Sequence, residues 1–316
     1  MSIIMKKIKK FPMRYLKKCI GYEEIYTLCY RPLKRDKLFE TKSIKEEQWV
    51  SLRFNNQYWY ADPILYNIKG KDFLFMEAYD RKKEKGCIAC SQLVDDIFTE
   101  PQIVIEEKYH MSFPMVFSWN DEIYMIPETS DNMSINIYKY EQNDNWKLIK
   151  SFNVGEKYVD TIVVNKNQYQ VSFLTSVVNK ENPLLYKWQV FNINSNAGFL
   201  SIEFPETNVY DKKYSGINRN AGRLFYHNDK LIHVVQESNE YDYGVNLLFY
   251  NVCEGQNQEL ISTVHCNSID IVGIKKKNYI GIHTYCYNGK YEIIDMRYLK
   301  YNPKYIARKI LNIIKK

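Results

Sequence analysis

Among the residues of this sequence that could do acid–base chemistry, Asp62 stands out. It lies in the run W-Y-A-D-P at residues 59–63, and no lysine or arginine occurs within six residues on either side. Because the proline after it restricts the backbone, Asp62 is expected either to shape a turn or to aim its carboxylate into a cavity. For one such acid alone, the turn is the simpler interpretation.

The same kind of unit recurs along the chain: an anchor residue, an apolar strand, a polar turn and a second strand that ends in polar groups. Successive anchors are 51, 47, 61 and 49 residues apart, and they are Asp62, Phe113, Asp160, Ala221 and Asp270. That period suits a four-stranded propeller blade with its loops. Long helical patterns are absent from residues 40–290, which argues against crossover helices. The sequence therefore predicts an all-β fold, a five-bladed β-propeller, with a two-sheet sandwich as the alternative.

Equivalent positions of the blades converge at one end of a propeller's central channel. This geometry would gather a set of polar side chains around one pocket, namely Asp62, Glu77, His110, Glu128, Asp160, Arg219, Asp270 and His283. Trp59 and Tyr60 would offer aromatic faces to a sugar ring. Carboxylates in an aromatic-lined cleft are candidates for acid–base chemistry on sugars, although each acid taken singly could instead cap a turn.

Basic side chains are concentrated at the two ends of the chain. Residues 1–20 and residues 297–316 each contain seven Lys or Arg and no acid, whereas the other 30 cationic side chains accompany 37 acidic ones. Apolar residues recur at helical spacing in both ends. Residues 1–22 and 298–316 are therefore predicted to be short basic amphipathic helices that flank a propeller of residues 23–297. Such helices bind anionic membrane surfaces, or pack on the body, and the acidic body argues against a nucleic-acid partner.

Several classes of site are disfavoured by the motifs. The seven cysteines have no framework spacing, which favours a reducing compartment, and the one C-x-x-C pair, Cys87 and Cys90, lacks the partners of a zinc site. No apolar run reaches the roughly 18 residues of a membrane span. Neither a G-x-x-x-x-G-K-S/T loop nor a G-x-G-x-x-G fingerprint occurs. We therefore expect no metal, no cofactor and a cytoplasmic location.

A set of dispersed motifs resembles one particular family. In chain order, between residues 45 and 297, they are W-Y-A-D-P-I-L-Y, F-L-F-M-E, K-G-C-I, Y-H-M-S-F-P-M-V-F, Y-M-I-P-E-T, V-D-T-I, R-N-A-G-R, Y-G, G-I-H-T-Y and Y-E-I-I-D-M-R. They are similar to the N-terminal five-bladed propeller domain of glucosamine inositolphosphorylceramide transferases, of which bacterial stand-alone relatives occur. That group is in turn distantly similar to family 43 glycoside hydrolases.

The resemblance implies roles for two of the acids. In family 43-like hydrolases an aspartate on the first blade is the general base, one on the third blade tunes and orients, and a glutamate on the fourth blade is the general acid. By resemblance Asp62 takes the first role and Asp160 the second. The fourth-blade anchor at residues 219–222 reads R-N-A-G, so hydrolysis lacks its expected acid. Glu237, on the next strand, would substitute only if its side chain reaches the pocket.

A missing acid matters less when the leaving group is a phosphate. The sequence therefore favours a glycosyltransferase in which Asp62 is the base and Asp160 and Glu128 orient or tune. Its expected place is cell-surface polysaccharide or glycolipid synthesis, peripheral to the inner face of the membrane. A family 43-like hydrolase and a non-catalytic glycan-binding propeller are the alternatives.

The expected partners follow from the remaining polar groups of the predicted pocket. His110, Arg219 and His283 would contact an anionic donor, a sugar nucleotide or a lipid-linked glycan, or the acceptor, because an arginine fork matches phosphate geometry.

Overall fold

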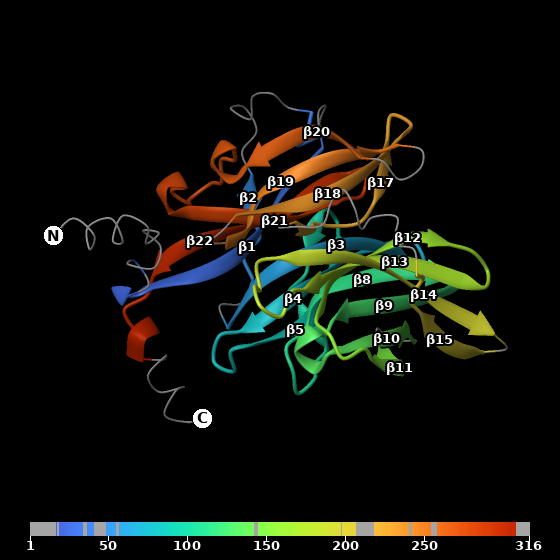
Figure 1. Ribbon diagram of the computed structural model, residues 1–316. Coiled ribbons are helices and arrows are strands. Elements are labelled where there is room, and N and C mark those ends of the chain that lie inside the picture. The colour runs from blue at the N-terminus through green and yellow to red at the C-terminus, as the bar shows by residue number, and fades with distance from the viewer. Residues whose placement is uncertain are drawn as a thin grey trace.

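The structure, a computed structural model, describes residues 17, 19–33, 37–40, 49–54, 57–141, 145–196, 198–206, 218–239, 242–253 and 258–307. Apart from single helical turns, the regular structure of these residues consists of strands, which form five antiparallel sheets arranged as the blades of a propeller (Figure 1). The predicted five-bladed fold is confirmed. The sandwich alternative is excluded.

Each blade runs from an inner strand at the central axis to an outer edge strand. Blade I contains β3 (Tyr58–Ile68), β4 (Lys71–Asp80), β5 (Lys85–Val94), β6 (Ile97–Phe98) and β7 (Gln102–Ile105). Blade II contains β8 (Ser112–Trp119), β9 (Glu122–Glu128), β10 (Ser134–Tyr140) and β11 (Trp146–Asn153). Blade III contains β12 (Tyr158–Lys166), β13 (Gln170–Val178), β14 (Tyr186–Asn196) and β15 (Phe199–Glu203). Blade IV contains β16 (Arg219–Asn220), β17 (Phe225–His227), β18 (Lys230–Asn239), β19 (Asp242–Val252) and β20 (Gln258–His265). Blade V contains β21 (Tyr279–Tyr287), β22 (Tyr291–Tyr301), β1 (Tyr22–Pro32) and β2 (Val50–Ser51). Short 3-10 turns lie at Ser130–Asn132, Cys266–Ser268 and Lys276–Asn278.

Blade V closes the ring with strands from both ends of the sequence. β1 pairs with β22 along its whole length, from Tyr22 opposite Tyr301 to Pro32 opposite Tyr291. β22 therefore continues to Tyr301, so residues 298–301 belong to the propeller and not to the predicted C-terminal helix. Described helical structure beyond them is limited to residues 305–307, and most of both predicted terminal helices lies outside the described residues.

Tight turns join the hairpins where the sequence places short polar pairs. Asn120 and Asp121 between β8 and β9 both have positive φ, as do Asn228 and Asp229 between β17 and β18. Two successive residues in this conformation match the right-handed twist of the flanking strands, and Asn and Asp tolerate it better than most residues.

The inner strands share an irregularity that positions the site. The register of β3 shifts between Ala61 and Ile64, and β8, β12 and β21 shift at the corresponding places. At three of these bulges a residue other than glycine has a positive φ: Asp62 at 52°, Phe113 at 42° and Asp160 at 50°. A bulge turns a side chain away from the regular alternation of a strand, and such strained backbone is often found at functional sites.

Aromatic side chains fill the spaces between neighbouring blades. Phe117 of blade II packs edge-on against Phe173 of blade III with ring centroids 5.3 Å apart, and Phe249 of blade IV packs against Tyr285 of blade V at 5.2 Å. These four rings are all buried. Each fully buried side chain of this size stabilises the fold by about 1.5–3 kcal/mol, so the contacts between blades hold the inner strands firmly in place.

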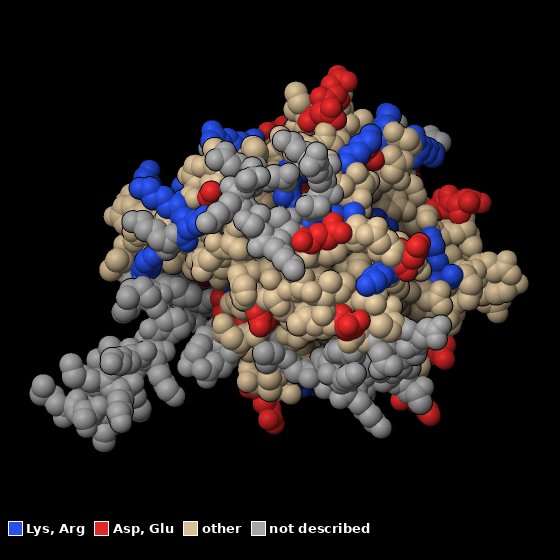
Figure 2. All heavy atoms as spheres, turned by 90° about the horizontal axis from the view of Figure 1, so that it is seen from above, with Lys and Arg blue, Asp and Glu red and all other residues tan. Residues whose placement is uncertain are grey.

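The described surface carries charges of both signs. On the face shown in Figure 2, acidic and basic side chains are interspersed and form no single basic stripe. Among the described residues, no helix is long and apolar enough to cross a membrane.

Candidate active site

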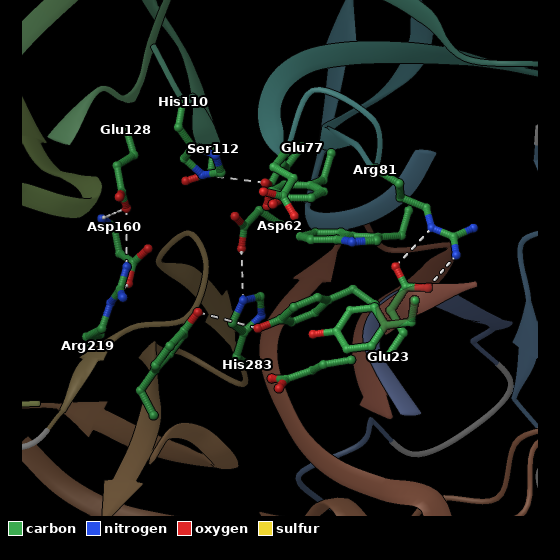
Figure 3. Close-up of a pocket in the computed structure, with 17 residues that line it drawn as sticks. Glu23, Asp62, Glu77, Arg81, His110, Ser112, Glu128, Asp160, Arg219 and His283 are labelled. Carbon is green, nitrogen blue, oxygen red and sulfur yellow. Dashed lines mark hydrogen bonds and ion pairs between the residues drawn. The ribbon is translucent and has the colours of Figure 1, made fainter. Parts of the chain in front are cut away.

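A cavity of about 360 Å³ opens at the end of the central channel where the inner strands begin. It is lined by eight of the residues that the sequence predicts for the site, namely Trp59, Asp62, Glu77, His110, Glu128, Asp160, Arg219 and His283 (Figure 3). These residues come from all five blades. The predicted convergence of distant residues is therefore found in the structure for this set.

The Asp62 carboxylate is buried at the floor of the cavity and is held on both oxygens. Its Oδ2 accepts a hydrogen bond of 3.1 Å from the backbone N–H of Phe113, and its Oδ1 accepts one of 2.9 Å from the Thr284 hydroxyl. Burial raises the pKa of Asp62 to about 6, although His283 opposes the rise. A carboxyl group with such a pKa exchanges its proton near neutral pH, as a general base must.

His283 and Asp295 support Asp62 from blade V. His283 Nδ1 lies 2.5 Å from Asp295 Oδ2, and its Nε2 lies 3.7 Å from Asp62 Oδ1. Burial opposes the imidazolium, but the carboxylates of Asp295 and Asp62 outweigh it and raise the pKa of His283. Asp295 also accepts the backbone N–H groups of Asp62 at 3.0 Å, His283 at 3.1 Å and Thr284 at 2.8 Å. One buried carboxylate thus fixes the base and its neighbour.

Among the described residues, Asp62, His283 and Asp295 form a group whose geometry would allow a metal ion to bind. Their ligand atoms in Asp62, His283 and Asp295 all lie within 4.8 Å of one another. Hydrogen bonds within the group and to the backbone already use these atoms. The arrangement is therefore explained without a cation.

Arg219 binds two carboxylates on the opposite side of the cavity (Figure 3). Its Nε donates to Asp160 Oδ2, and its Nη2 donates to Glu128 Oε2 at 3.2 Å. Burial raises the pKa of Asp160 to about 6 and also raises that of Glu128, while Arg219 lowers both. Two acids therefore already bind Arg219, and its predicted contact with an anionic donor stays a prediction.

Gln236 and Glu237 are neighbours in β18, and their side chains face opposite sides of the blade. Gln236 Nε2 donates to Asp160 Oδ2 at 2.9 Å, whereas Glu237 accepts a hydrogen bond of 2.5 Å from Asn246 and does not line the cavity. Because side chains alternate along a strand, Glu237 cannot reach the pocket while Gln236 does. The suggestion that Glu237 supplies the missing acid is wrong.

Glu77 is the buried acid of the cavity with the fewest contacts. Its Oε1 accepts no hydrogen bond among the described residues and lies 3.5 Å from His110 Nε2. Burial, with help from the nearby carboxylates, raises the pKa of Glu77 well above its usual value. His110 Nδ1 accepts the backbone N–H of Gly86 at 2.9 Å, so a neutral His110 carries its proton on Nε2, toward Glu77 and the cavity. Burial lowers the pKa of His110, which favours this neutral form.

An aromatic wall forms another side of the cavity. Trp59 stacks on Tyr79 with ring centroids 4.3 Å apart and an angle of 8° between the rings, and Tyr26 lies 4.8 Å from Trp59. Tyr60, on the other face of β3, is buried against Phe54 and does not line the cavity. The prediction for Trp59 agrees with its position in the structure, and the one for Tyr60 is wrong.

Asp270 lies outside the site. It is exposed, its carboxylate is 3.9 Å from Lys276, and its backbone carbonyl accepts the N–H of Trp49. The bulge of blade V falls within β21 instead, at His283 and Thr284. The predicted fifth anchor, Asp270, therefore precedes the true one in the sequence.

Some residues of the site were not predicted. They are Glu23, Glu24, Tyr26, Tyr79, Arg81, Glu84, Ser112, Tyr243 and Tyr305 in the lining, with Thr284 and Asp295 beneath it. In all, seven carboxyl groups and two guanidinium groups line the cavity, and Arg81 is paired with Glu23 at 2.5 Å. The cavity is thus strongly acidic in composition, and both of its arginines are already bound to acids.

Residues 48–301 match the family described as glucosamine inositolphosphorylceramide transferase 1, N-terminal. The chain belongs to this family. Glucosamine inositolphosphorylceramide transferase 1 of Arabidopsis thaliana is 32% identical over 189 residues, which cover 58% of this chain and 24% of that protein. The protein of the same name from Oryza sativa subsp. japonica is 26% identical over 195 residues, or 61% of this chain and 26% of that protein. The match therefore spans about a quarter of the length of these relatives.

The fold of this family member also resembles a solved structure. An alpha-L-arabinofuranosidase from Lactobacillus brevis superposes with a TM-score of 0.50 at 13% identity, covering 66% of this chain and 80% of the other. At this identity the likeness concerns the fold alone. Together, the comparisons identify a carbohydrate-related propeller of the transferase family, as the motifs indicated.

Proposed function

We propose that this chain is a carbohydrate-active enzyme that transfers a glycosyl group, with Asp62 as its general base. The observation that carries the proposal is the inward carboxylate of Asp62, fixed by the Phe113 N–H and the Thr284 hydroxyl on the floor of an aromatic-walled cavity. Asp62 removes the proton of an acceptor hydroxyl, whose oxygen forms a bond to the anomeric carbon. The bond from that carbon to the leaving oxygen breaks, and the leaving group keeps the electron pair.

Glu77 is the best candidate for a proton donor to the leaving oxygen. Burial raises its pKa well above the usual value, which favours the protonated form, and its Oε1 is not engaged in a hydrogen bond among the described residues. It would replace the acid that the fourth blade lacks. The same observation favours hydrolysis as a second candidate function, in which water is the acceptor, because a paired base and acid suffice to cleave a glycoside.

The charge of the cavity indicates the class of sugar. Seven carboxyl groups line the cavity and its two arginines are already paired, so a phosphate placed inside would meet repulsion. A sugar nucleotide is therefore disfavoured as the donor, because its phosphate is bonded to the reacting anomeric carbon. A neutral sugar or one with a protonated amine fits better. The relatives' name contains glucosamine, and an amino sugar is accordingly our proposed occupant.

We also propose that the protein works at the inner face of the cytoplasmic membrane, on a lipid-linked substrate. The basic ends of the sequence carry seven cations each, and the described strands next to them are paired at Tyr22 and Tyr301. Both ends therefore leave the same blade. Two basic segments starting at one point would act on an anionic surface together.

The test of the catalytic proposal is the Asp62→Asn variant, with the exposed Asp270→Asn as the matched control. Both proteins are given a panel of nitrophenyl glycosides and of sugar nucleotides with amino-sugar acceptors, and products are identified by mass spectrometry. Removal of a general base should lower kcat/KM by about 10²–10⁴-fold in Asp62→Asn, with Asp270→Asn unchanged. A new glycoside product supports transfer, and free sugar supports hydrolysis. Turnover by Asp62→Asn at the wild-type rate would overturn the proposal, as would tight sugar binding without turnover by the wild type.

A further inference from the structure

A second cavity, also of about 360 Å³, lies at the opposite end of the central channel. The inner strands run from the acidic cavity, where Asp62 and Asp160 lie, and end around this second one. Its polar and aromatic lining includes Tyr66 of β3, Ser118 of β8, Lys166 of β12, and Arg223 and Tyr226 of blade IV. No acidic residue lines this cavity among the described residues, so the two ends of the channel have opposite charge.

Arg223 projects into this cavity without an acidic partner. Its guanidinium lies 4.9 Å from the centroid of the Tyr66 ring, and Nη1 donates a long hydrogen bond of 3.3 Å to the carbonyl oxygen of Leu65. Arg223 is only partly exposed, and burial lowers its pKa. Placing a cation in such surroundings without a counter-ion is costly.

Other partly or fully buried arginines of the described chain do have such a partner. They are Arg31 with Glu292, Arg81 with Glu23, Arg219 with Glu128 and Asp160, and Arg297 with Asp242 and Glu24. Arg223 makes no ion pair with a carboxylate in the described part of the chain. This contrast shows that the fold normally neutralises such a charge and does not do so here.

Lys166 adds a second cation to the same cavity. Its Nζ donates to the carbonyl oxygen of Ser118 at 2.7 Å and to the Ser118 hydroxyl at 2.9 Å, which orients the ammonium group. Burial and the charge of Arg223 both lower the pKa of Lys166, and no carboxylate is among the causes. Two cations that repel one another across a hollow are stabilised by an anion that binds both.

We propose that this cavity binds the phosphate group of a phosphate ester, held between Arg223 and Lys166. A guanidinium fork can bind two phosphate oxygens, and an ammonium group can bind a third as a point charge. The exposed ring of Tyr226, with 74% of its surface accessible, offers an apolar face to the organic part of the ester. The site is separate from the acidic sugar cavity, and it would take either a soluble ester or the headgroup of a lipid.

Binding is tested on the full chain with inorganic phosphate and glycerol phosphate, by thermal unfolding and calorimetry. A ligand at roughly ten times its Kd should raise the Tm of the wild type by about 3 °C. Arg223→Gln and Lys166→Gln should each weaken binding by about tenfold or more, since each loses a charge-assisted contact. Lys180→Gln, which changes a lysine with 78% of its side chain exposed elsewhere on the surface, serves as the control and should behave as the wild type.

A vesicle arm identifies the source of the phosphate group. Sedimentation with phosphatidic acid in phosphatidylcholine is compared for the wild type, Arg223→Gln, Lys166→Gln and Lys180→Gln, all of which keep both basic ends. If Arg223→Gln weakens sedimentation with vesicles but not the binding of glycerol phosphate, the ligand is a lipid headgroup. If it weakens only the binding of glycerol phosphate, the ligand is a soluble ester. If Arg223→Gln unfolds, the same comparisons are made with Lys166→Gln, because Lys166 is exposed and its replacement should not disturb the fold. Equal responses of wild type, Lys166→Gln and Lys180→Gln in both arms would overturn the proposal.

Discussion

The carboxylate of Asp295 accepts the backbone N–H of Asp62 at 3.0 Å, although the two residues are 233 positions apart in the chain. This bond joins the inner strand of the first blade to the second strand of the last blade. The same carboxylate binds His283, so one side chain both links the first blade to the last and orients the base. A site built in this way exists only when the propeller is complete.

We expect Asp295→Asn to lower both stability and activity. The amide has one acceptor oxygen where the carboxylate has two, and it removes the carboxylate nearest to the His283 ring, whose charge raises the pKa of that histidine. Breaking a buried pair of this kind costs about 3–5 kcal/mol. Urea unfolding measures the loss, and Asp270→Asn should stay within about 0.5 kcal/mol of the wild type. An unchanged unfolding midpoint for Asp295→Asn would show that the contacts of Asp295 with His283 and Asp62 do not stabilise the fold.

Stability and activity should respond in opposite ways as the pH rises through 6. Burial lifts the pKa of Asp62 from 3.8 to about 6, so the folded protein holds this proton more tightly than the unfolded chain does. Stability from this group is therefore lost between about pH 4 and pH 6, while kcat/KM rises because the base becomes ionised. Asp62→Asn, which can still bond to Phe113 and Thr284, should flatten that part of the stability curve. Urea unfolding of the wild type and of Asp62→Asn across this pH range provides the measurement. If the free energies of unfolding of the two proteins changed with pH in parallel, the pKa assigned to Asp62 would be contradicted.

Much of the fold and part of the site could be predicted because they follow a period. Asp62 and Asp160 are about two blades apart in the sequence, and their surroundings mark them as anchors of similar strands. The prediction of the fifth anchor is wrong because the bulge of blade V lies at His283 and Thr284, in the inner strand β21 that follows Asp270 in the chain. Asp270 lies in the loop before that strand.

The parts that could not be predicted depend on which face a side chain occupies. Asp295 lies in the run Y-E-I-I-D-M-R, and its apolar neighbours Ile294 and Met296 were the available signal of a buried role. Gln236 and Glu237 are neighbours, and only the register of β18 decides that the amide faces Asp160 while the acid faces away. The neutralisation of Arg219 by two acids depends likewise on contacts between three blades.

Arg219→Met should be strongly destabilising at neutral pH and less so in acid. The change leaves Asp160 and Glu128 buried without their cation, at a cost of about 3–5 kcal/mol when both are ionised. Protonation of the two carboxyl groups removes most of that cost, and the loss of Arg219 raises their pKa further, so the difference from the wild type should shrink as the pH falls toward about 6, the pKa of Asp160 when Arg219 is present. Urea unfolding at neutral and acidic pH provides the measurement. A deficit that does not depend on pH would indicate lost packing and not lost charge.

The basic ends predict a salt-sensitive association with membranes. The full chain should sediment with vesicles that contain phosphatidylserine, and binding should fall steeply between low and physiological salt because each basic residue near the surface contributes about 1 kcal/mol that salt screens. Deletion of residues 1–16 and 308–316 should abolish it without unfolding the propeller, since β1 and β22 stay intact. Vesicles of phosphatidylcholine alone are the control. Equal binding by the truncated chain would assign the effect to the body.

Gly86→Ala should lower kcat by more than its loss of folding stability would explain. A Cβ at this position would lie 2.6 Å from Glu77 Oε1, 2.8 Å from His110 Cε1 and 2.5 Å from the Met111 carbonyl oxygen, so the two side chains must move. Overpacking of this kind costs about 1–3 kcal/mol, and it displaces the proposed proton donor. Gly155→Ala is the control, because nothing lies within 4 Å of its added Cβ and its positive φ makes it strained as well. If Glu77 donates the proton, Gly86→Ala loses kcat on substrates with poor leaving groups, whereas Gly155→Ala keeps kcat on all of them. Equal kcat for both variants would remove Glu77 from the mechanism.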